Sequence, residues 1–143
     1  QLVSDNVHVT FWHIDERDEA GTPSGWGLNF SVSRLLGERW MPFLRAGWAN
    51  DGGSLLDRSV SAGFSYQAVR GRDLLGVAFN WGRPNEDSFG PGLDDQWTFE
   101  VFYRWQVLRE LAVTPSLQLL IDPALNPDES TIWMLGLRLR YAL

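Results

Sequence analysis

Strict alternation of apolar and polar side chains is the feature that most constrains this chain. The longest runs place apolar side chains at every second position of 97–107 and of 133–143. A period of two is the repeat of a β-strand with one apolar face, because successive strand side chains point to opposite sides of a sheet. Six shorter segments show the same period: 7–12, 26–33, 40–48, 60–67, 75–82 and 113–122. The sequence therefore predicts eight strands and no helix.

The connections between these segments alternate in length. Short turns are expected around 37–39, 70–72 and 109–110, and longer polar loops over 15–24, 50–57, 83–95 and 122–130. This alternation is typical of an antiparallel up-and-down sheet. Matching polar faces across the short turns predicts three cross-strand pairs: Arg45–Ser31, Ser65–Ala78 and Arg104–Ser116.

Composition narrows the class of protein. The chain has 143 residues, of which 44% are hydrophobic and 21% are charged, as expected for one folded domain over 1–143. It lacks cysteine, which excludes disulfides and thiolate metal sites. The net charge of −6 argues against a nucleic-acid partner. No apolar run approaches the roughly 18 residues of a spanning helix.

Large aromatic side chains lie at both ends of the apolar face, with aliphatic residues and Phe between them. At the long-loop ends these are Trp26, Trp48, Trp81, Trp97 and Trp133, and at the short-turn ends Trp40, Tyr66, Trp105 and Tyr141. Two aromatic girdles match the two interfaces of a bilayer, where amphipathic rings are favoured. The apolar face is therefore predicted to point outward into lipid, and a soluble barrel or sandwich is the weaker alternative.

The opposite face is small and polar, and it carries the candidate functional residues. The predicted pore-lining residues are Arg45, Glu100, Arg104, Arg138, Arg140, Asn29, Asn80 and Gln118. Charges inside a pore set a transverse field and hydrogen-bond sugar hydroxyls, although the same charges could instead form a stiffening salt-bridge network. Trp12 and Phe43 interrupt this face, and they either stack on a sugar or, as we favour, fill space.

Loop composition indicates an orientation. Thirteen of the 18 acidic residues fall in or beside the four long loops. Outer-membrane barrels have short periplasmic turns and longer extracellular loops, so both termini are expected on the periplasmic side.

The sequence gives little support for enzyme catalysis or metal binding. His13, Asp15 and Ser24 share the outward face near the long-loop end, which would suit an outer-membrane lipid hydrolase, but no motif surrounds them. The acidic segments 15–19 and 122–129 lack the ligand spacing of a calcium loop. We therefore expect no catalytic residues, no metal and no cofactor.

Several stretches resemble one known family. They include 12–15, 25–27, 42–47, 75–79, 81–84, 100 with 103–104, 121–127 and 136–140. Taken in this order, they resemble the C-terminal part of the carbohydrate-selective, glucose-type porins of Gram-negative outer membranes. The resemblance implies a sixteen-stranded barrel, an outer-membrane lipid environment, and passive diffusion of sugars or small neutral solutes.

Eight strands are about half of such a barrel, and the family's N-terminal portion is missing from this sequence. Two arrangements follow. The chain forms half of a wide pore, completed by another chain or by the missing half, or its strands close into a narrow barrel. A closed eight-stranded barrel would be filled by its own side chains and would have a structural or lipid-interacting role.

Overall fold

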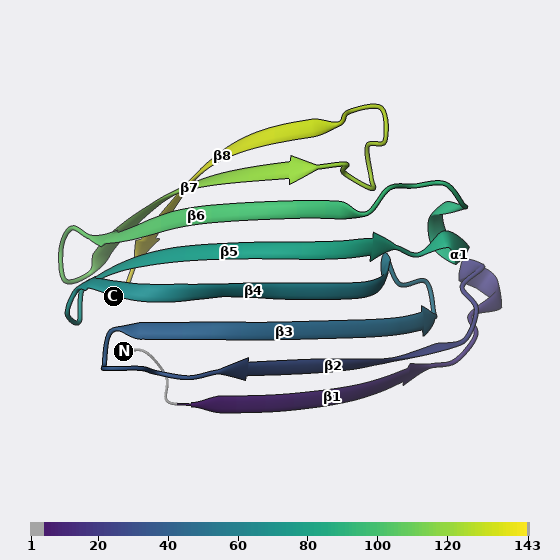
Figure 1. Ribbon diagram of the computed structural model, residues 1–143, viewed down its shortest axis with the longest axis horizontal. Helices are drawn as coiled ribbons and strands as arrows, with labels where there is room; N and C mark the ends of the chain where they lie inside the picture. The colour runs from purple at the N-terminus through teal and green to yellow at the C-terminus, as the bar shows by residue number, and fades with distance from the viewer. Residues whose placement is uncertain (1–4, 143) are drawn as a thin grey trace.

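The computed structural model describes residues 5–142, and these form one sheet of eight antiparallel strands in sequence order. The strands are β1 (Asn6–Ile14), β2 (Gly25–Ser33), β3 (Trp40–Asp51), β4 (Leu56–Val69), β5 (Asp73–Pro84), β6 (Gln96–Gln106), β7 (Leu111–Ile121) and β8 (Thr131–Tyr141). Figure 1 shows the short turns at one end of the sheet and the long loops at the other. The all-β, up-and-down prediction is confirmed, while Leu143, the last residue of the predicted alternation, lies outside the described residues.

The prediction of no helix is wrong in two of the long loops. A 3-10 turn covers Asp18–Ala20, and one turn of α-helix, α1, covers Glu86–Phe89. The Asn85 side chain begins α1 by accepting a hydrogen bond from the backbone N–H of Asp87 at 3.0 Å. Such a cap satisfies a backbone donor that has no partner within the helix. Alternation cannot reveal single turns of this kind.

The strand register confirms one predicted pair and corrects two. Ser31 lies opposite Arg45, as predicted. Ser65 pairs with Gly76 instead of Ala78, and Ser116 pairs with Phe102 instead of Arg104. Both errors are slips of two residues, so each side chain stays on the predicted face. A β-bulge near the β4–β5 turn accounts for one residue of the first slip and the position of that turn for the other. The second slip arises because the β6–β7 turn is centred one residue earlier than expected.

The apolar side chains lie on the surface. Among residues 5–142, Ala112 is the only buried hydrophobic residue. Large apolar side chains are widely exposed, with Leu135 at 88% and Phe11 at 66%. A soluble barrel or sandwich would enclose such side chains in a core, whereas this sheet leaves them on its surface.

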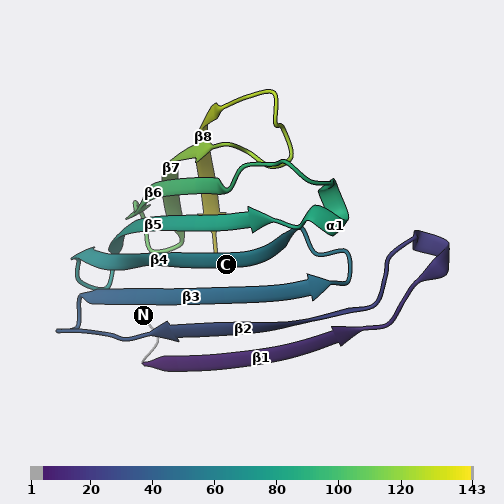
Figure 2. The same cartoon turned by 45° about the vertical axis from the view of Figure 1, so that its right-hand side comes forward.

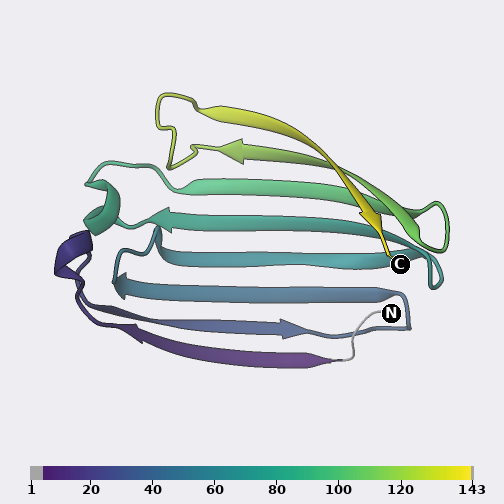
Figure 3. The ribbon, with the colours of Figure 1, turned by 180° about the vertical axis from the view of Figure 1, so that it is seen from behind.

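The sheet is curved and open. In Figure 3, seen from behind, β8 passes in front of its neighbours, whereas in Figure 1 it passes behind them, and the turned view of Figure 2 shows the same bend. Within the described residues β1 pairs only with β2, and β8 only with β7. The strands therefore form a curved wall, and they do not close into the narrow barrel that the sequence left open.

Side-chain hydrogen bonds connect neighbouring segments at each end of the sheet. At the short-turn end, buried Asp73 accepts hydrogen bonds from the Tyr103 hydroxyl at 3.1 Å and from the backbone N–H of Gln106 at 3.0 Å. At the long-loop end, the buried side chain of Asn85 donates to the Ser54 hydroxyl at 2.8 Å. These contacts join segments about thirty residues apart in the chain, so they fix neighbouring hairpins relative to one another.

Candidate pore wall

The polar face of the sheet brings most of the predicted residues into cross-strand rows. Arg45 lies between Ser31 and Ser61, and Ser61 in turn lies opposite Asn80. The Asn80 side chain donates a hydrogen bond to the Ser61 hydroxyl at 2.7 Å. Nearby rows place Asn29 opposite Gly47 and Glu100 opposite Gln118.

A hollow on this face gathers four of the predicted residues. Its volume is about 460 Å³, and its lining includes Glu100, Arg104, Arg138 and Arg140. The hollow lies where β8 curls toward the rear of Figure 1, so the polar face is the concave one. The other predicted residues, Arg45, Asn29, Asn80 and Gln118, lie on the same face outside this hollow.

The concave face carries unpaired positive charge. The ion pairs found within residues 5–142 lie toward the ends of the strands and in the connections, for example Arg34 with Asp5 at 3.4 Å and Arg70 with Glu38. None of them includes a concave-face arginine. The predicted alternative of an internal salt-bridge network therefore has no support in the described part of the chain.

Aromatic side chains on the concave face lie over glycines of the neighbouring strand. Trp12 pairs with Gly27, Phe43 with Gly63, and Phe102 with Gly76. A Cβ atom added to any of these glycines would collide with the aromatic ring. This packing supports the space-filling interpretation of Trp12 and Phe43, because each ring occupies the site that a side chain would otherwise take.

Sequence reasoning missed several residues around the hollow, notably Phe102, Thr114 and Ser116. Phe102 could have been found, because an aromatic residue opposite a glycine in the correct register signals this packing. Thr114 and Ser116 carried no distinctive signal, since small hydroxyl residues are common on a polar strand face.

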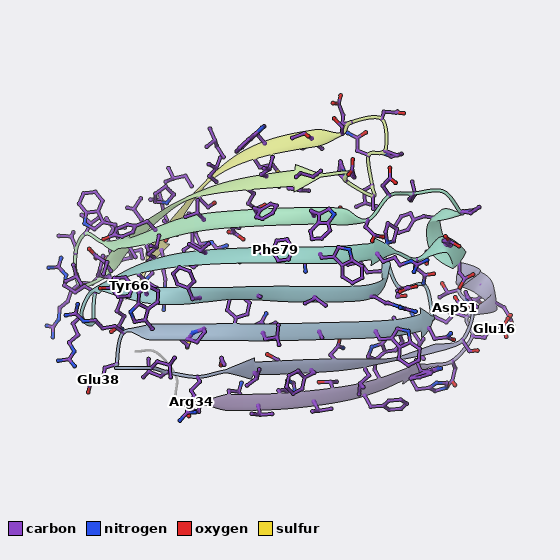
Figure 4. All side chains as sticks on the ribbon, viewed as in Figure 1. Glu16, Arg34, Glu38, Asp51, Tyr66 and Phe79 are labelled. Atoms are coloured by element: carbon purple, nitrogen blue, oxygen red, sulfur yellow. The ribbon has the colours of Figure 1, made fainter. Side chains whose placement is uncertain are left out.

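The predicted girdle residues lie on the apolar face. Many of their rings are in contact: Trp26 and Trp48 have centroids 4.7 Å apart, and Trp40 and Tyr66 lie 4.5 Å apart. Trp81 pairs with Trp97, Trp133 with Leu119, Trp105 with Val113, and Tyr141 with Leu111. Figure 4 shows Tyr66 toward the short-turn end and Phe79 nearer the middle of the sheet. Their action as membrane anchors stays a prediction.

The hydrolase alternative gains little from the geometry. His13 and Asp15 form an exposed pair, with Nε2 and Oδ1 3.1 Å apart. Within the described residues no hydrogen bond connects Ser24 to His13, so the contact that would activate a serine nucleophile is lacking.

Residues 5–142 lack two further features. No group of three or more His, Cys, Asp or Glu side chains lies close enough to hold a metal ion. None of the helices in this part of the chain has the length and apolar character needed to cross a membrane.

A curved antiparallel sheet with an apolar outer face and a polar, arginine-bearing inner face defines a segment of an outer-membrane β-barrel of the porin class. Comparison with protein families agrees: the family described as "Carbohydrate-selective porin, OprB family" matches residues 16–143. The chain belongs to this family, whose members are channels of the bacterial outer membrane. No curated protein and no solved structure gave a significant match. The resemblance noted in the sequence is thus confirmed at the level of the family.

Proposed function

We propose that this chain forms part of the wall of an outer-membrane channel through which sugars and other small neutral solutes diffuse passively. The observation that carries the proposal is the separation of the two faces, within a chain of a carbohydrate-selective porin family. An apolar convex face suits lipid, and a polar concave face suits an aqueous lumen.

The concave residues would act as weak ligands for passing sugars. Arginines and the amide side chains donate hydrogen bonds to sugar hydroxyl oxygens, and Glu100 accepts from hydroxyl groups. The set assigned to this role is Arg45, Glu100, Arg104, Arg138, Arg140, Asn29, Asn80 and Gln118. Conduction requires binding that is weak enough to release the solute, and solvent-exposed hydrogen bonds meet this requirement.

The edges of the sheet require partners. Backbone groups on β1 and β8 that face away from the sheet are unpaired within the described residues, and unpaired backbone is not tolerated in the hydrocarbon of a bilayer. β1 runs toward the long loops and β8 runs away from them. Antiparallel pairing to further strands can therefore complete a barrel at both edges. Those strands come either from another chain or from the family's N-terminal portion.

We assign the short-turn end to the periplasm, and with it both termini. The acidic long loops would then be extracellular, the usual arrangement for outer-membrane barrels.

Uptake of radiolabelled glucose into proteoliposomes tests the proposed function. The chain, alone or with the rest of its barrel, should admit glucose much faster than protein-free vesicles do, with a rate that is linear in protein amount. A protein that inserts and folds, yet admits no sugar in either form, would contradict the channel function.

A further inference from the structure

Three arginines on the concave face, Arg104, Arg138 and Arg140, form a compact group that we call the arginine triad. The register pairs Phe102 with Ser116 and Trp105 with Val113, which sets Arg104 beside Thr114. Thr114 in turn pairs with Arg138, so one hydroxyl residue lies between two arginines. Arg138 and Arg140 are two residues apart on one face of β8, or roughly 7 Å along the strand. Arg104 and Arg138 are two strands apart, or roughly 10 Å.

The triad has no protein carboxylate to neutralise it in the described part of the chain. No ion pair there includes Arg104, Arg138 or Arg140. The Nε atom of Arg104 is buried without a hydrogen-bond partner, while its Nη2 atom donates to the Arg72 carbonyl oxygen at 3.5 Å. Glu100 borders the same hollow but is four residues from Arg104 along β6, roughly 13 Å away. Its position leaves the space over the triad open to an anion from solution.

The hollow is lined by the types of side chain that bind a negatively charged sugar. Arginine binds carboxylate and phosphate through paired N–H donors, and these charge-assisted hydrogen bonds are stronger than bonds to neutral hydroxyls. Thr114 and Ser116 offer hydroxyl groups, and the ring of Phe102 offers an apolar surface. A volume of about 460 Å³ falls in the range of small-molecule sites, and Glu100 lies across the hollow to accept from sugar hydroxyls.

We propose that the arginine triad is a subsite for the anionic group of an acidic sugar, such as a sugar carboxylate or a sugar phosphate. This inference rests on the proposed channel function and adds acidic sugars to the neutral solutes proposed above. The channel wall would then favour anionic monosaccharides over neutral ones. Asp5 and Glu38 are paired with arginines in the connections, whereas Glu110 lies in the β6–β7 turn near Arg140, where its carbonyl oxygen accepts a hydrogen bond from the backbone N–H of Ala142.

Ligand-observed NMR on the complete barrel that contains this chain, in lipid nanodiscs, tests the subsite. Glucuronate, glucose 6-phosphate and glucose are titrated separately, so that carboxylate and phosphate are distinguished from each other and from the neutral sugar. At least one acidic sugar should bind about tenfold more tightly than glucose. The double variant Arg138→Gln/Arg140→Gln should lose most of this preference, with a smaller loss for glucose.

Two further variants sharpen the result. Arg39→Gln removes one positive charge from the exposed β2–β3 turn and should leave the preference unchanged. Arg45→Gln removes one positive charge from the concave face outside the hollow and should weaken acidic-sugar binding less than the single variant Arg138→Gln does.

Equal affinity for acidic and neutral sugars would overturn the subsite, as would equal losses in Arg45→Gln and in Arg138→Gln. Glucose uptake into proteoliposomes separates this failure from that of the channel. If glucose enters the vesicles but the protein binds acidic sugars no more tightly than glucose, the channel function holds and the subsite is wrong. If no sugar binds or enters, both are wrong.

Discussion

Glycine determines where aromatic side chains can lie on the concave face. Gly76 leaves room for the ring of Phe102 on the neighbouring strand. A Cβ atom at Gly63 would collide with the backbone of β5 as well as with the ring of Phe43. Each ring then lies along the wall, where it obstructs the lumen less than a ring projecting from it would. Bulky residues are in this way compatible with a solvent-lined surface.

Replacing Gly76 with alanine should destabilise the sheet. The new methyl group would collide with the Phe102 ring, and overpacking of this kind costs about 1–3 kcal/mol. Urea unfolding in lipid vesicles measures the free energy of unfolding. A double-mutant cycle with Phe102→Ala should show a coupling of about 1 kcal/mol, because alanine at 76 meets no ring once Phe102 is removed. Strict additivity of the two substitutions would contradict the packing.

Asp73 should matter more to stability than other carboxylates near the strand ends. It is buried and accepts hydrogen bonds from Tyr103 and from the backbone of Gln106. Asp73→Asn replaces a charged acceptor by a weaker neutral one, which should cost about 1–3 kcal/mol of unfolding free energy. Asp128→Asn, in an exposed loop, is the matched control and should change stability little. Equal effects in the two variants would remove the role assigned to Asp73.

Each strand presents two environments, one residue apart. On β6, Val101 lies on the apolar face opposite Val77 and Leu117, whereas its neighbour Glu100 lies on the polar face opposite Ala78 and Gln118. Period-two patterning encodes this division directly, which is why alternation predicted both faces correctly for every strand.

An arginine placed on the apolar face of β6 should be costly. Val101→Arg lies midway along the strand, and a cation near the bilayer midplane costs about 2–4 kcal/mol. Gln118→Arg, on the polar face opposite Glu100, should change the unfolding free energy by much less. Denaturant titration of both variants in vesicles gives the comparison. Similar costs for the two would show that neither face is in lipid.

The sequence predicted the strands, the faces and the family, but it could not provide the finer geometry. A slip of two residues preserves every face, so patterning could not distinguish Ser65–Ala78 from Ser65–Gly76. The bulge and the position of the turn together decide between them, and both depend on local backbone geometry. The hollow was also beyond prediction, because it arises from the curvature that brings β8 back over its neighbours.

The whole molecule is a curved sheet whose two edge strands, β1 and β8, each pair with one neighbour within the described residues. Its convex face exposes apolar side chains. Its concave face carries arginines that form no ion pair within the described residues. The exposed apolar face is unfavourable in water and becomes favourable when lipid covers it, whereas the arginines require that the other face stays in contact with water. The environment is therefore part of what stabilises the fold.

The absence of cysteine makes the orientation of the two faces directly measurable. Ser116→Cys puts one thiol on the concave face, and Leu117→Cys puts one on the convex face of the same strand. In outer membranes, a charged, water-soluble thiol reagent should label the cysteine at 116 and leave that at 117 unmodified. Labelling only at 117, or equally at both positions, would contradict a polar face that lines an aqueous pore.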